Sequence, residues 1–134
     1  INARGEDGST LLHMFANDDN LDVAKYLVEN GAKLDILGEN DATPLHYALS
    51  FVSGDHPKIV KYLIEQGANI EAKDKDGSTV LLLSVEYMLD KVFDVLLEMG
   101  ADVSAQDNRG NTPLHLLWTE SKIDDFEWMN LLQM

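Results

Sequence analysis

The chain has 134 residues, 45% of them hydrophobic, a length and composition that suit one compact unit with an apolar core. Its 24 acidic and 10 basic residues give a formal net charge of −14, which argues against nucleic acid and anionic lipid as partners. The lack of cysteine excludes disulfides and thiolate metal sites, and no apolar run suggests a membrane span or a signal peptide, so we expect a soluble protein of a reducing, intracellular compartment such as the cytoplasm.

A four-residue motif that begins with threonine recurs along the chain. Its copies are Thr10-Leu11-Leu12-His13, Thr43-Pro44-Leu45-His46, Thr79-Val80-Leu81-Leu82 and Thr112-Pro113-Leu114-His115. The threonines are 33, 36 and 33 residues apart, and a glycine-alanine pair at Gly31, Gly67 and Gly100 keeps the same interval. Two motifs in one register indicate an internal repeat.

Each repeat carries the signals of two helices and a turn. Threonine can cap the free amides of a helix, and proline is well tolerated in the first turn, so Thr43-Pro44 and Thr112-Pro113 predict the start of a first helix. Apolar residues such as Ile59, Leu63 and Ile64 then follow helical spacing and predict a second helix. Glycine marks the loop tips between repeats, except in the second repeat, where we expect Asp41 to adopt the turn conformation at some cost.

This motif at a period near 33 closely resembles the ankyrin repeat. The resemblance implies a mainly α solenoid of helix-turn-helix units joined by hairpin-like loops. We expect the tail of a preceding repeat at 1–3, repeats at 4–36, 37–73 and 74–106, and a truncated repeat at 107–134, with a three-residue insertion in 37–73. The incomplete first and last units suggest a piece of a longer ankyrin protein, with further repeats or other domains as neighbours.

The histidines could suggest a metal or acid-base site, but three of them share one repeat position. At that position neighbours stand roughly 8 to 10 Å apart, too far to share an ion. In ankyrin repeats this histidine bonds backbone and threonine groups, so the resemblance implies a structural role, which Leu82 puts in doubt for the third repeat. The structural motif positions are Thr10, His13, Thr43, Pro44, His46, Thr79, Thr112, Pro113 and His115.

Catalysis has no visible apparatus in this chain. The acidic runs lack the alternating ligands and glycine of a calcium loop, and no nucleotide, zinc-protease or serine-hydrolase motif occurs. We expect no metal and no cofactor, and a non-catalytic scaffold that binds a partner protein or peptide. The alternatives are a regulatory or targeting module of a larger enzyme or channel, and a structural spacer.

In the ankyrin family, partners usually contact the loop tips and the exposed side of the first helix, which line the concave face. The position after the motif histidine is apolar in all four repeats, at Met14, Tyr47, Leu83 and Leu116. Helical spacing places Phe51 beside Tyr47 and Tyr87 beside Leu83, and Glu39, Asp76, Glu86 and Arg109 border this stripe. It predicts a partner with apolar anchors and basic flanks, unless these residues pack against the loops between repeats.

Overall fold

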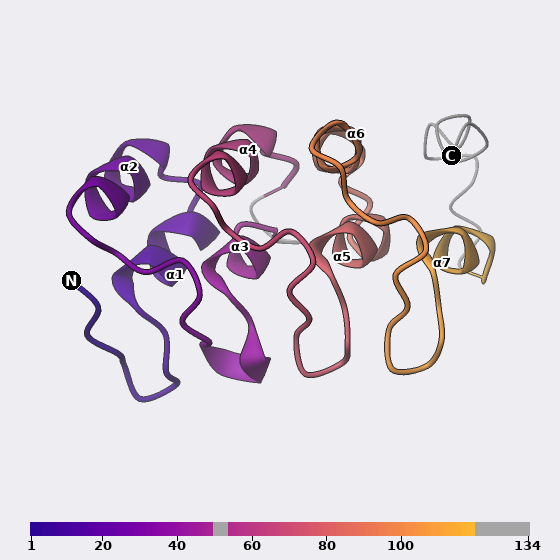
Figure 1. The fold of residues 1–134 in the computed structure, drawn as a ribbon, viewed down its shortest axis with the longest axis horizontal. Helices are drawn as coiled ribbons and strands as arrows, with labels where there is room; N and C mark the ends of the chain where they lie inside the picture. Colours follow the sequence, from indigo (N-terminus) through magenta and orange to yellow (C-terminus); the bar gives the residue numbers. More distant parts are fainter. Residues whose placement is uncertain (50–53, 120–134) are drawn as a thin grey trace.

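A computed structural model describes residues 1–49 and 54–119. The elements within them are α1 (Leu11–Asn17), α2 (Leu21–Glu29), the short 3₁₀ turn η1 (Glu39–Asp41), α3 (Pro44–Tyr47), α4 (Pro57–Glu65), α5 (Val80–Glu86), α6 (Asp90–Glu98) and α7 (Pro113–Thr119). Figure 1 shows α2, α4 and α6 in one layer and α1, α3, α5 and α7 in a second. The predicted mainly α repeat array is confirmed. None of the described helices has the length and apolar character that a membrane span requires.

The first helices begin where the threonine motif predicts. The Thr43 hydroxyl oxygen accepts a hydrogen bond from the amide of His46 at 3.3 Å, and Pro44 fills the first helical position. Thr79 caps the amide of Leu82 in the same way at 3.4 Å. Each cap satisfies an amide that the helix itself leaves without an acceptor.

The core lies between the two helix layers and between successive repeats. Ile59, Leu63, Val92 and Leu96 of the second helices are fully buried, as their spacing predicts. Leu12, Leu45 and Leu81 of the first helices are buried as well. Each such side chain contributes about 1.5 to 3 kcal/mol to folding through removal of apolar surface from water.

Two first-helix side chains of the fourth repeat are exposed at positions that are buried in the earlier repeats. Leu114, which corresponds to the three buried leucines, is 53% exposed, and Trp118, which corresponds to the buried Leu49 and Val85, is 74% exposed. Each first helix packs on the next along the array, from α1 to α3, α5 and α7. Within the described residues no first helix follows α7, so the side of α7 that would face one stays open.

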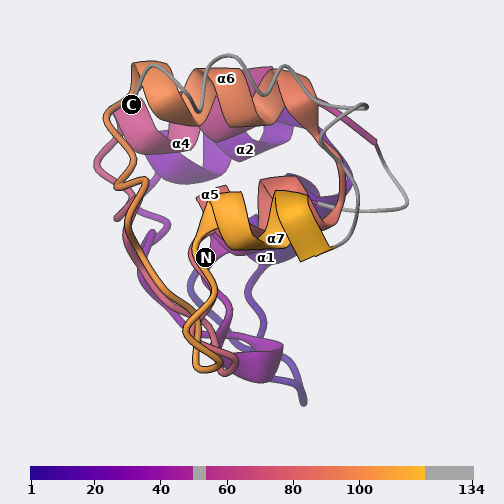
Figure 2. The same ribbon diagram turned by 90° about the vertical axis from the view of Figure 1, so that its right-hand side faces the viewer.

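Hydrogen bonds join each loop to the next loop along the array. The amide of Lys75 donates to the carbonyl of Asn40 at 2.8 Å, and the amide of Asn108 donates to the carbonyl of Asp76 at 3.0 Å. The side-chain amide of Asn108 adds a bond to the carbonyl of Lys75 at 3.0 Å. These bonds hold the loops as one continuous surface. Figure 2 shows that the loops turn away from the helix layers, and we call the side between the loops and the first helices the concave side.

The loop of the second repeat has the conformation expected from its unusual tip. Asp41 lies in the left-handed region with φ of 58°, where the other repeats place Gly8, Gly77 and Gly110. Asn40 also has φ of 58°. The turn therefore forms without glycine, at the free-energy cost that a side chain incurs in the left-handed region.

Asp55 and His56, beside the insertion of the second repeat, contact the third and the first repeat. Asp55 accepts hydrogen bonds from the amides of Lys91 at 2.8 Å and Val92 at 2.9 Å, so it caps α6 of the next repeat. Burial, followed by a hydrogen bond with Asp90, raises the pKa of Asp55. On the other side the exposed ring of His56 lies 3.3 Å from the Asp19 carboxylate.

Part of the predicted organisation falls outside the described residues. Phe51 lies there, and so does the second helix expected for the fourth repeat. The repeat limits at 4–36, 37–73, 74–106 and 107–134 stay predictions.

Candidate functional site

The motif histidines join each repeat to the next. The ring of His46 accepts a hydrogen bond at Nδ1 from the amide of Thr43 at 3.2 Å, and its Nε2 lies 3.0 Å from the carbonyl oxygen of Ser78 in the following repeat. His13 has the same arrangement with Thr10 at 3.0 Å and the carbonyl of Ala42 at 3.1 Å. Because a backbone amide can only donate, Nδ1 is the acceptor and Nε2 carries the proton that it donates to the carbonyl.

The surroundings of the first motif histidine, His13, disfavour its charged form. Burial is the largest cause and lowers the pKa of the ring. In the fourth repeat His115 likewise accepts from the amide of Thr112 at 3.3 Å. The rings contact the threonine and backbone groups that the resemblance implied. The described residues hold no group of three or more histidine, aspartate or glutamate side chains arranged to bind a metal ion.

Leu82 replaces the histidine in the third repeat without loss of the helix. Its side chain is buried in the core, and Thr79 still caps its amide. The polar link to the next repeat is exchanged for apolar burial, so this junction does not depend on the charge state of a ring.

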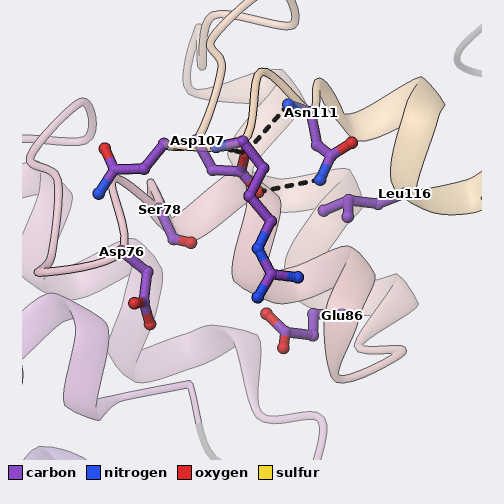
Figure 3. A pocket seen from close by; sticks show the side chains of 8 residues that line it. Asp76, Ser78, Glu86, Asp107, Asn111 and Leu116 are labelled. Carbon is purple, nitrogen blue, oxygen red and sulfur yellow. Dashed lines mark hydrogen bonds between the residues drawn. The ribbon is translucent and has the colours of Figure 1, made fainter.

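The described residues form three grooves on the concave side, each bounded by loop residues and a first helix. The first has a volume of about 630 Å³ and is lined by residues that include Arg4, Asp7, Leu11, Met14, Asp18 and Tyr47. The second, of about 290 Å³, is lined by residues that include Glu39, Asn40, Tyr47, Asp74, Leu83 and Tyr87. The third, of about 320 Å³, is lined by Asp76, Ser78, Glu86, Asp107, Asn108, Arg109, Asn111 and Leu116 (Figure 3).

The expectation of four outward apolar side chains is wrong for two of them. Met14 is 55% exposed and Tyr47 is half-buried, but Leu83 is only 8% exposed and Leu116 only 9%. Exposure at this position is highest in the first repeat, since among the described residues no helix precedes α1, and it is lowest in the third and fourth repeats, where residues of the preceding repeat line the same groove. Leu83 and Leu116 therefore belong to the apolar floor of the second and third grooves.

Tyr47 is held within the protein more firmly than the sequence indicated. Its hydroxyl lies 2.8 Å from the Ser9 hydroxyl and accepts a hydrogen bond from the amide of Glu39 at 3.0 Å. Its ring meets the ring of His13 edge to face, with centroids 4.6 Å apart. Tyr47 thus links the loops of the first and second repeats, in addition to lining two grooves.

Two residues that shape these grooves were not predicted from the sequence. Gly38 is one, because a Cβ atom there would lie 2.9 Å from both the Ser9 and the Tyr47 hydroxyl oxygens. Asp74 is the other, since its Oδ1 accepts the amides of Asp76 and Ser78, both at 2.9 Å, and so sets the shape of the loop. The recurrence of aspartate five residues before the motif threonine, seen again at Asp107, was the signal that could have revealed it.

The electrostatic character of the second groove is negative. The pKa of Tyr87 is raised first by burial and then by the negative charges of Glu86, Asp74 and Asp76. Glu39 adds a further carboxylate to the lining. A group that enters this groove therefore meets an aromatic ring within a negative field, a setting that favours cations.

Comparison with known proteins agrees with the repeat geometry. The family model described as ankyrin repeats (3 copies) matches residues 1–74 and residues 52–129. No curated protein matches the chain.

Proposed function

Because this chain belongs to the ankyrin-repeat family, we propose that it is a non-catalytic module that binds a partner protein or peptide through its concave side. Ankyrin repeats generally mediate protein–protein interaction. The family is typically non-catalytic.

The observation that supports this proposal is the row of three grooves along loops that are hydrogen-bonded to one another. The same kinds of element, two loops and a first helix, line successive grooves. Loops that are already fixed lose little conformational entropy when a partner binds, which favours affinity. A spacer would not require such a set of preformed polar depressions.

Charge indicates the chemistry of the partner. Glu39, Asp76 and Glu86 are exposed at the edges of the grooves, and Arg109 is the basic residue in the third. Such a surface attracts a basic segment and accelerates its association. Apolar contacts would come from Met14, Tyr87 and the leucine floors of the grooves rather than from a continuous exposed stripe.

A second observation favours further repeats as neighbours. The side of α7 that carries Leu114 and Trp118 is exposed at positions that are buried in the earlier repeats. A following repeat would cover this apolar surface in the way that α3 and α5 cover their predecessors. Addition of one ankyrin repeat after residue 134 should raise the melting temperature by several degrees, and an unchanged melting temperature would argue against stacking here.

Site-specific photo-crosslinking tests the concave side as the binding surface. A photoreactive phenylalanine analogue at Asp76 should crosslink a partner in extract of the source cells, because this residue lies at the edge of the third groove. The same analogue at Lys61, exposed on α4 in the outer helix layer, serves as the control. Crosslinks from Lys61 alone would place the partner on the opposite side and refute the proposal.

A further inference from the structure

The second and third grooves are equivalent places one repeat apart. Each is lined by an aspartate five residues before the motif threonine, Asp74 or Asp107, and by a leucine four residues after it, Leu83 or Leu116. The grooves are therefore built on the same frame, and a difference between them reflects the side chains that each repeat places on it.

One such difference is a basic side chain. The third groove contains Arg109 together with the carboxylates of Asp76, Glu86 and Asp107 (Figure 3). One repeat earlier, the residue at the position of Arg109 is Asp76, whose negative charge helps to raise the pKa of Tyr87 in the second groove. Among the described residues that line the second groove, none is a lysine or arginine. The array thus places an arginine of its own in the lining of one acidic groove and no basic side chain among the described lining residues of the equivalent groove.

The lining of the second groove suits a guanidinium group. Two hydrogen bonds to Oδ1 fix the Asp74 carboxylate, and Glu39 supplies a second carboxylate on the neighbouring loop. Tyr87 supplies an aromatic ring, on which a planar guanidinium can stack while its N–H groups reach the carboxylates. The ammonium of lysine, a compact and strongly hydrated charge, makes less use of a ring and two carboxylates together.

Accordingly, we propose that the second groove binds an arginine side chain from an extended segment of a partner protein, with the guanidinium against Tyr87 and between Glu39 and Asp74. This assignment rests on the proposed function, because it specifies the partner chemistry of one concave groove. The occupant is a peptide segment because the loops on both sides of the groove form a continuous rim along which a chain can lie.

Nuclear magnetic resonance titration of the isotope-labelled chain tests the assignment with defined probes. The first probe is a capped heptapeptide with arginine at its centre and leucine two residues to either side. The matched probes carry lysine or the neutral isostere citrulline in place of arginine. We expect the arginine peptide to shift the amides of residues 39–42 and 83–87, to bind roughly fivefold or more tightly than the citrulline peptide because its hydrogen bonds are charge-assisted, and to weaken with salt.

Matched variants distinguish binding in the second groove from nonspecific attraction to the negatively charged protein. Glu39→Gln removes one exposed carboxylate with little change in shape and should weaken the arginine peptide several-fold, and Tyr87→Leu should do the same by removing the ring. Glu65→Gln removes the same charge from α4 in the outer layer and should leave binding unchanged. Thermal unfolding of each variant shows whether the fold is retained, and Glu39→Gln carries the test if Tyr87→Leu does not fold.

Three results would overturn the assignment. They are equal affinity for the arginine and citrulline peptides, amide shifts confined to residues outside the second groove, and no amide shift with any peptide at millimolar concentration. Shifts confined to the first or third groove would remove the arginine site but leave the concave side as the binding surface. Failure of the proposed function is a separate result, namely a partner that crosslinks only to the outer helix layer.

Discussion

Replacement of Tyr47 by phenylalanine should lower the free energy of unfolding by about 1 kcal/mol, because it removes a hydroxyl with two hydrogen-bonding partners. One partner, the Ser9 hydroxyl, belongs to a buried residue that would lose this bond, whereas Glu39 is exposed and its amide can bond to water. Tyr47→Ala also removes the edge-to-face contact with His13 and part of the buried ring, so its expected cost is about 2 to 3 kcal/mol.

Urea unfolding monitored by circular dichroism measures both values. A double-mutant cycle with Ser9→Ala isolates the hydroxyl pair and should give a coupling free energy of about 0.5 to 1 kcal/mol. The interpretation of Tyr47 as a partner anchor alone predicts that its substitution leaves stability unchanged. If Tyr47→Phe unfolds at the same urea concentration as the parent and the cycle gives no coupling, the hydroxyl makes no stabilising link between the loops and our reasoning is wrong.

Three further substitutions test other features by the same unfolding assay. Gly38→Ala places a methyl group against the two bonded hydroxyls and should destabilise by about 1 to 3 kcal/mol, whereas Gly5→Ala, at the same place in the first loop, meets only ordinary contacts at 3.5 Å or more and should be tolerated. Folding lowers the pKa of His13 from 6.5, so as the pH falls the unfolded chain takes up a proton before the folded chain does, and the free energy of unfolding should decrease below that pH. His13→Leu should reduce this pH dependence. A variant with the same pH profile as the parent would contradict the role given to His13. Asp41→Gly should leave stability unchanged or raise it by at most roughly 1 kcal/mol, since glycine is unstrained at φ of 58°, and a clear loss would reveal a further role for the aspartate.

The helices and their order could be predicted from the sequence because their signals are local. Threonine followed by proline favours a helix start through a cap and a fixed φ angle, and the apolar residues of one helix fall on one side through the helical period alone. The recurrence of these signals at a nearly fixed interval indicated the repeat architecture. Asp41 was assigned to a glycine position by register alone, and the structure places it in the left-handed region.

The candidate site could be predicted only in part, because it depends on residues one repeat apart. The loop positions of Glu39, Asp76 and Arg109, and the position of Glu86 at the end of α5, followed from the register, and these residues line grooves. The exposure of Leu83 was judged from its own helix, however, and the preceding repeat covers it. Phe51 lies outside the described residues, so its pairing with Tyr47 stays a prediction.

By itself, the sequence determined that this chain is an array of two-helix repeats, because helix caps, helical faces and loop tips are encoded within a few residues of each other. Only the tertiary structure decided which side chains the array buries and which it offers to a partner. It assigned Tyr47 to a junction between loops, Asp55 to the cap of a helix in the next repeat, and Arg109 to an acidic groove. The physical reason is that burial, hydrogen bonding and electrostatic potential at each of these positions are set by neighbours about 33 residues away in the sequence, which a local pattern does not specify.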